Sequence, residues 1–263
     1  MIDISAELRK EKGGLIAVPC KAVQGAVMDA FGTALLDYHA GERNHMVRIE
    51  RDDGFWDEHS AEMYFAPEPF PDEAAALANA EGPLLDIGCG AGRHLLWAEA
   101  QSIVATGIDM SPGAVSCAMA RGCREVIEGD VAAMDLGARQ FATATLFGNN
   151  IGIGGSWEGA VALLAAIGRV MRPEGRLALT SLNVSRTENP QHLAYHAKNT
   201  AAGVPKGELT MRIHYKDLVD PWIKWFHPQP EELRAIARNA GWHVADLVED
   251  SNGFYWAGLR WPG

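Results

Sequence analysis

Short apolar runs alternate with segments of helical spacing along the chain from residue 83 onward. Segments with apolar side chains at helical spacing cover 93–101, 112–122 and 156–171. Strands that are interleaved with helices of this length are typical of a parallel sheet covered on both faces. We therefore predict an α/β fold. The runs that predict its strands are LLDIG at 84–88, IVATGIDMS at 103–111, EVIEGDV at 125–131, FATATLFGN at 141–149 and RLALTSL at 176–182.

The end of the chain follows a different pattern. Residues 230–242 have helical spacing, and residues 243–250 and 254–261 predict two strands joined by the tight-turn sequence Ser-Asn-Gly. Two strands joined by such a turn form a hairpin. We therefore predict a mostly parallel seven-stranded sheet whose last strand is antiparallel.

Two segments lie outside this alternation. Residues 18–40 have apolar side chains at helical spacing, whereas residues 42–72 are rich in charges and aromatic rings and predict an irregular cap before a short helix at 72–80. The segment after the fifth strand contains two further candidate strands, at 208–215 and 221–226. A long insertion at the carboxyl ends of strands is usually functional.

These patterns divide the chain into four parts. We predict a helical N-terminal cap at 1–80, a ligand-binding core at 81–182, a lid or substrate insertion at 183–227, and a helix and hairpin at 228–263 that complete the core.

Charge and cysteine content narrow the possible partners and compartment. The formal net charge of −11 argues against nucleic acid or an anionic membrane as the main partner, because both require a basic face. No apolar run is long enough to span a bilayer, and the first residues lack a signal-peptide pattern. The cysteines have no C-x-x-C spacing. We therefore expect a reduced, cytoplasmic protein with no disulfides and no metal site.

A glycine-rich loop follows the first strand of the core, in the sequence LLDIGCGAGRH at 84–94. In open α/β sheets, ligands bind beyond the carboxyl ends of the strands. A dinucleotide-binding loop has its third glycine three residues after the second, and Arg93 occupies that position here. Asp86, just upstream, is an unfavourable neighbour for phosphates. The loop therefore suits a ligand that carries no phosphate.

Acidic residues occur near the ends of three consecutive strands. A carboxylate at Asp86 would attract a sulfonium or an α-amino group. Asp109 could accept hydrogen bonds from both hydroxyls of a ribose, which fits NAD equally well. Asp130 distinguishes the two ligands, because with Val131 it would contact an adenine ring. This combination favours a nucleoside without phosphates, such as S-adenosylmethionine.

Four segments resemble the motifs of class I S-adenosylmethionine-dependent methyltransferases. LLDIGCGAG is similar to their first motif, GIDMS to the second, EGDV to the adenine-contacting motif, and VMRPEGRLALTS to the segment around the fifth strand. The resemblance covers roughly residues 80–182 and 228–262, because the closing hairpin also matches the reversed last strand of that fold. It departs at Ala142, where the family usually has an aspartate. The resemblance implies the class I fold, S-adenosylmethionine as cofactor, and methyl transfer.

The turn LFGNNIGIGG at 146–155 follows the fourth strand, where methyltransferases meet their substrate. It lacks the Asn/Asp-Pro-Pro-Tyr/Phe motif of enzymes that methylate amino groups of nucleobases or glutamine. Its Gly-Asn-Asn resembles instead the Gly-Asn-Ser of glycine N-methyltransferase-like enzymes. We therefore expect a small-molecule acceptor with an N, O or C nucleophile, aligned by residues 147–150 for in-line displacement. Alternatively, Asn149 and Asn150 cap the next helix and tie the loop.

The resemblance to methyltransferases and the positions of the strand ends together predict individual site residues. Candidate substrate contacts are Asn150, Phe65 and Tyr215. If the reaction needs a base, the candidates are His45 in the cap and His214 in the insertion. We expect the cofactor to contact Tyr64, Asp86, Gly88, Cys89, Gly90, Gly92, His94, Asp109, Met110, Asp130, Val131, Phe147, Gly148 and Asn149.

Two other functions remain open from the sequence. One is an NAD(P)-dependent oxidoreductase, which Arg93 and Asp130 disfavour. The other is a non-catalytic S-adenosylmethionine-binding module, because the motifs encode binding more clearly than chemistry. The identity of the acceptor and the oligomeric state are not predicted.

Overall fold

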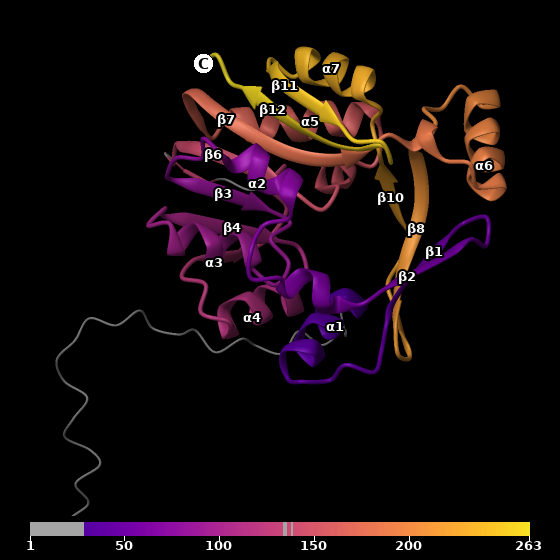
Figure 1. Ribbon diagram of the computed structural model, residues 1–263, viewed down its shortest axis with the longest axis horizontal. Helices are drawn as coiled ribbons and strands as arrows, with labels where there is room; N and C mark the ends of the chain where they lie inside the picture. The colour runs from indigo at the N-terminus through magenta and orange to yellow at the C-terminus, as the bar shows by residue number, and fades with distance from the viewer. Residues whose placement is uncertain (1–28, 134–135, 138) are drawn as a thin grey trace, which may run out of the picture.

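A seven-stranded sheet forms the core of the protein (Figure 1). The computed structural model describes residues 29–133, 136–137 and 139–263, so the part of the predicted helix that precedes residue 29, together with Cys20, lies outside the described residues. The strand order is β11-β12-β7-β6-β3-β4-β5. The strands are β3 (Leu84–Ile87), β4 (Ala105–Asp109), β5 (Val126–Glu128), β6 (Phe141–Leu146), β7 (Met171–Leu182), β11 (His243–Glu249) and β12 (Phe254–Arg260).

The sheet confirms the predicted topology. Strands β3 to β7 pair in parallel, whereas β12 is antiparallel to both of its neighbours, β7 and β11. The chain order reverses between β3 and β6, so the loops after these strands meet at one edge of the sheet.

Helices cover both faces of this sheet. Apolar side chains of α5 (Trp157–Gly168) and α7 (Pro230–Asn239) pack in one cluster with β6, β7 and β12. Side chains of α2 (Pro71–Leu77), α3 (Arg93–Ala100) and α4 (Pro112–Ala120) pack in a second cluster on the opposite face. Within the described residues no helix is both long and apolar enough to cross a membrane.

A second, antiparallel sheet combines the cap with the insertion. Its main order is β10-β8-β1-β2, and β9 pairs with β8. Figure 1 shows this sheet beside the core. The division into cap, core, insertion and closing hairpin remains a prediction, but strands of the cap and the insertion belong to one sheet. They are β1 (Val47–Arg51), β2 (Trp56–His59), β8 (Glu208–Tyr215), β9 (Leu218–Val219) and β10 (Ile223–Phe226).

The strands predicted at 208–215 and 221–226 are confirmed, whereas the expectation that 42–72 is irregular is wrong. The segment contains β1, β2 and the 3-10 helix η2 (Ala61–Phe65). β1 places Glu50 opposite Arg212 of β8, so its pairing partner lies far away in the sequence. β1 alternates apolar Val47 and Ile49 with charged Arg48 and Glu50, but this signal spans only five residues, and β2 has no such alternation.

Helix α1 (Ala30–His39) connects the second sheet to the core. A Cβ on Gly113 of α4 would lie 2.7 Å from the Gly32 Cα, so the two helices approach closely. The Asp29 carboxylate accepts hydrogen bonds from the Gly113 amide and the Ser111 hydroxyl, at 2.8 Å each. Asp220, after β9, accepts from the Ala30 amide at 2.7 Å. These bonds hold the cap against the carboxyl ends of the core strands.

The remaining helical elements lie at the other loops. The helix α6 (Pro190–Ala201) belongs to the insertion, and its Tyr195 hydroxyl donates to Asp52, in the turn after β1, at 2.8 Å. The 3-10 helices are η3 (Asn150–Gly154), which follows β6, and η4 (Val184–Arg186), which follows β7.

Candidate functional site

The glycine loop turns the chain sharply from β3 into α3. Gly88, Gly90 and Gly92 have φ values of 69°, 53° and 75°, a region that side chains disfavour. A Cβ on Gly88 would also lie 2.3 Å from the Asn150 side-chain nitrogen. Gly90 is buried, and a Cβ on it would lie 4.0 Å from Phe31 and Tyr64, which is ordinary van der Waals contact. Glycine is therefore needed for the turn, and residues of the cap cover Gly90.

Asp109 fixes the loop from the neighbouring strand. Its carboxylate accepts hydrogen bonds from the Gly90 amide at 2.8 Å and the Ser111 amide at 2.9 Å. Burial raises the pKa of Asp109, and repulsion from the Asp86 and Asp29 carboxylates adds to this effect. The negative charge that gathers here favours a cationic ligand and disfavours a phosphate.

Asp86 is a buried carboxylate at the end of β3. The Thr145 hydroxyl donates to its Oδ1 at 2.6 Å. Its Oδ2 is also buried and lies toward the His94 imidazole, but no hydrogen bond within the described part of the chain satisfies it. A buried carboxylate oxygen that lacks a full hydrogen bond favours a cationic group nearby.

His94 lies between Asp86 and an acid of the cap. Its Nδ1 is 3.6 Å from Asp86 Oδ2, and its Nε2 is 3.2 Å from Glu73 Oε2 of α2. Arg93 also pairs with Glu73, and its guanidinium stacks on Phe70. Burial alone would lower the pKa of His94, but the two carboxylates outweigh burial and raise it. The protonated imidazole therefore links the first helix of the core to the cap.

The predicted adenine contacts lie at the adjoining strand ends. The Gly129 amide donates to the Asp109 carbonyl at 2.9 Å, which brings the turn after β5 beside Asp109. In that turn Asp130 accepts from the Ala132 amide at 2.8 Å, and Val131 is buried. Met110 is 66% exposed although it is apolar. An exposed thioether beside Asp109 could pack against an aromatic ring such as adenine. The adenine contacts of Met110, Asp130 and Val131 remain predictions.

The turn after β6 supports the glycine loop. Gly148 and Asn149 both have a φ of 64°, and the buried Phe147 ring lies 4.8 Å from the His94 ring. The Asn150 amide donates to the carbonyls of Ile87 and Gly88 at 2.9 Å each. Asn150 therefore ties the loop, which is the alternative that the sequence left open, and its contact with a substrate remains a prediction.

Cap residues lie over the loop. The Arg121 guanidinium donates to the carbonyls of Ala91, at 2.5 Å, and Tyr64, at 3.5 Å, and stacks on Phe65. The Phe65 ring is 4.6 Å from the Tyr38 ring. Phe65 thus helps to dock the cap, and its predicted contact with the substrate remains untested.

Cys89 is held inside the loop as an inert thiol. Its side chain is buried, and burial raises its pKa, with the Asp86 and Asp109 carboxylates adding to the shift. A thiol with a raised pKa is a poor nucleophile. Cys89 therefore fits packing within the loop, and its predicted contact with the cofactor remains untested.

The predicted bases do not gather at the loop. His214 Nε2 lies 2.8 Å from Glu50, and Trp56 covers its ring at 4.8 Å. His214 is opposite Arg48 in the sheet, on the face turned away from α1. His45 is exposed, and its ring lies 6.0 Å from the ring of Tyr215, which is buried against α1. The catalytic roles of these histidines and the substrate contact of Tyr215 remain predictions that this geometry does not favour.

The sequence analysis missed several residues that shape the site. Glu73 and Arg121 connect the cap to the loop, and His59 Nε2 lies 2.9 Å from the Tyr64 hydroxyl. Only the spacing of His59 and Tyr64, five residues apart in EHSAEMYF, could have drawn attention to the pair. The spacing indicates a contact between the two side chains only when the turn from β2 into η2 is known.

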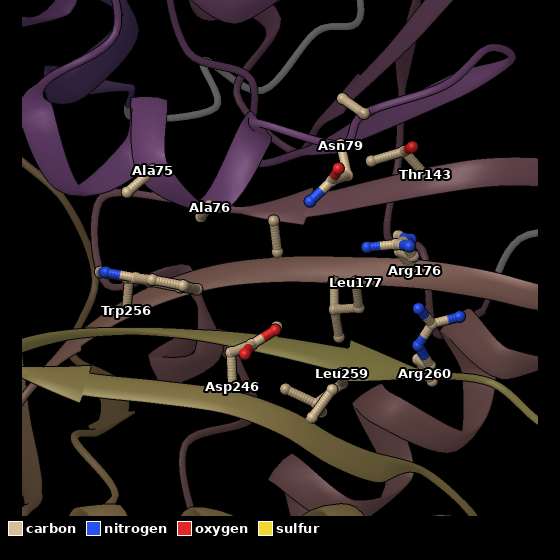
Figure 2. Close-up of a pocket in the computed structure, with 14 residues that line it drawn as sticks. Ala75, Ala76, Asn79, Thr143, Arg176, Leu177, Asp246, Trp256, Leu259 and Arg260 are labelled. Carbon is tan, nitrogen blue, oxygen red and sulfur yellow. The ribbon is translucent and has the colours of Figure 1, made fainter.

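A separate pocket lies away from this edge, between α2 and the sheet (Figure 2). Ala75, Asn79, Arg176, Trp256 and Arg260 are among the residues that line it. None of the residues predicted to bind the cofactor lines this pocket, as far as the chain is described. Among the described residues no group of three or more potential metal ligands comes together.

Comparisons with known proteins agree with this architecture. Residues 84–175 match a family model described as a methyltransferase domain. An S-adenosylmethionine-dependent methyltransferase from Bacteroides fragilis, solved with S-adenosyl-L-homocysteine, has a TM-score of 0.77 and 24% identity, covering 90% of this chain and 97% of that one. The CcbJ methyltransferase from Streptomyces caelestis has a TM-score of 0.60 and 14% identity, covering 77% and 96%.

A curated relative shares a shorter segment. It is the 18S rRNA (guanine-N(7))-methyltransferase bud23 of Schizosaccharomyces pombe, which is 41% identical over 68 residues. The match spans 25% of this chain and 24% of that protein. The solved structures establish the fold, and this short match leaves the acceptor undetermined.

The Asn150 contacts generate a first prediction. Asn150→Ala removes two hydrogen bonds to the glycine loop and should cost roughly 1–3 kcal/mol there. We expect the affinity for S-adenosylhomocysteine, measured by calorimetry, to fall about tenfold. Asn44→Ala, in an exposed loop of the cap, is the matched control and should leave the affinity unchanged. An Asn150→Ala protein with wild-type affinity would show that the tie is dispensable.

The His94 cluster generates a second prediction. Because the pKa of His94 is raised in the folded state, its contribution to stability is complete below the ordinary value of 6.5 and is lost as the pH rises through the folded pKa. The difference in the free energy of unfolding between wild type and His94→Gln should therefore be largest near pH 6 and shrink toward pH 9. Denaturant titrations at several pH values measure it. A difference that does not vary with pH would contradict a protonated His94.

Proposed function

We propose that this chain transfers a methyl group from S-adenosylmethionine to a small molecule, because its fold is that of solved class I methyltransferases and residues 84–175 match a methyltransferase-domain model. The observation that carries the proposal is the hydrogen bond from the Gly90 amide to Asp109. A pyrophosphate would need that amide, and it would meet the charges of Asp109 and Asp86. The site therefore supports a cationic nucleoside over a dinucleotide, which argues against the oxidoreductase alternative.

Each polar group of the site has a proposed part in holding the cofactor. Asp86 Oδ2, beside His94, accepts from the ammonium group, and Asp109 accepts from the ribose hydroxyls while it keeps the loop in place. Met110, Asp130 and Val131 surround the adenine. S-adenosylmethionine supplies a methyl carbon that its sulfonium has already activated, so the protein mainly needs to align the acceptor and exclude water.

A small acceptor fits the covering of the site. Helix α1, η2 and the second sheet lie over the carboxyl ends of the core strands, where a large substrate would have to enter. The net charge of −11 also opposes binding of RNA. The matched rRNA methyltransferase makes RNA the main alternative acceptor, and a non-catalytic binding module is the second.

We also infer a cytoplasmic location and a function without a membrane partner. The described cysteines, Cys89, Cys117 and Cys123, are all buried free thiols, which supports a reducing compartment.

A labelling experiment tests the acceptor class. Purified protein is incubated with methyl-labelled S-adenosylmethionine and, separately, with a panel of primary amines, phenols and carboxylates or with total RNA. We expect label in at least one small molecule and none in RNA. Label in RNA alone would overturn the small-molecule proposal. A protein that binds S-adenosylhomocysteine but labels nothing would support the non-catalytic module.

A further inference from the structure

His59 and Tyr64 form a hydrogen-bonded pair in the cap. His59 is the last residue of β2 and Tyr64 belongs to η2, and their Nε2 and Oη atoms are 2.9 Å apart. The sequence predicts Tyr64 as a cofactor contact. The pair is distinct from His214, whose imidazole is already bound to Glu50.

The pair lies beside the glycine loop. Tyr64 Cδ1 lies 4.0 Å from the position that a Cβ on Gly90 would occupy, and the Tyr64 ring packs edge-on against Phe31 at 5.1 Å. His59 is opposite Val47 in the second sheet, on the face that packs against α1. The Tyr64 backbone is fixed by Arg121. Both side chains therefore lie between the second sheet and the cofactor loop.

The pair is chemically able to accept a proton. Burial lowers the pKa of His59, against a smaller opposing effect of Asp57, so its imidazole is neutral near pH 7. Burial raises the pKa of Tyr64 to about 12, against a smaller effect of Arg93. The neutral tyrosine can thus donate its proton to a neutral imidazole. The amide side chains of Asn149 and Asn150 cannot take a proton near neutrality.

We propose that the Tyr64 hydroxyl faces the methyl-transfer point and that the His59–Tyr64 pair takes the proton of the acceptor. This inference rests on the proposed methyltransferase function. The lone pair of the acceptor's N or O atom forms a bond to the methyl carbon while the carbon–sulfur bond breaks and its electron pair stays on sulfur. The acceptor's proton passes to Tyr64 Oη as the Tyr64 proton passes to His59 Nε2. The imidazolium then releases that proton to solvent.

Sinefungin tests the position of the pair without a known acceptor, because it carries an amine where S-adenosylmethionine carries its methyl-bearing sulfonium. We expect Tyr64→Phe to weaken sinefungin binding roughly tenfold, as one hydrogen bond to a charged group is lost, and to change S-adenosylhomocysteine binding less than about threefold. Tyr38→Phe, another tyrosine of the cap, should change neither affinity. Calorimetry gives both values.

Failure of this inference can be distinguished from failure of the proposed function. Equal affinity changes for both ligands, or no change for sinefungin, would show that the Tyr64 hydroxyl is not at the methyl position and would overturn the inference. Failure of wild-type protein to bind S-adenosylhomocysteine would instead overturn the proposed function.

Turnover with an acceptor found by the labelling experiment tests the proton transfer. His59→Gln keeps a hydrogen-bonding side chain but no base, and we expect it to lower kcat by about 10²–10⁴-fold with cofactor affinity retained. The wild-type kcat should decrease at acidic pH, below the ordinary histidine value of 6.5, as His59 becomes protonated. A His59→Gln protein within about threefold of the wild-type kcat would overturn the role of the pair as proton acceptor.

Discussion

The hydrogen bond from the Gly90 amide to the Asp109 carboxylate is the interaction on which the site depends. A hydrogen bond to a charged group contributes roughly 1.5–3 kcal/mol, which is enough to select one conformation of a short glycine loop. It joins the ends of β3 and β4 and places a negative charge where other glycine loops present free amides to phosphates. Asp86 adds a second, buried carboxylate beside His94. The two acids make this end of the sheet unfavourable for phosphates.

The cap and the insertion complete the site as one unit. Their strands pair within a single sheet, and Asp29 and Asp220 fasten α1 between that sheet and the core. Arg93 and Arg121 add contacts from the cap to the helices that follow the cofactor strands. The second sheet, α1 and the loop are thus joined by charged, partly buried contacts.

The core could be predicted from the sequence because its information is local. Most core strands are short apolar runs, and α4 and α5 begin at the capping residues Ser111 and Ser156. The glycine loop and the acids near it could also be predicted, because a glycine with positive φ and a charged side chain can each be recognised from a single position. The role of Asn150 was left as one of two alternatives, since an amide side chain suits a carbonyl and a substrate equally.

The cap could not be predicted in the same way. β1 and β2 carry charged side chains that acquire partners only when β8 lies beside them, as with Glu50, Arg212 and His214. The His59–Tyr64 pair depends on how β2 turns into η2, and the His94 cluster depends on where α2 docks. Such contacts arise from tertiary packing, and no spacing rule for metal or catalytic residues describes them.

The most direct test of the account is the affinity of Asp109→Ala for S-adenosylhomocysteine. Calorimetry on this variant, on wild type and on Glu231→Ala, an exposed acid of α7, separates the local carboxylate from general charge. We predict a loss of at least about tenfold for Asp109→Ala and wild-type affinity for Glu231→Ala, with both variants folded. Unchanged affinity in a folded Asp109→Ala protein would contradict the proposed cofactor site.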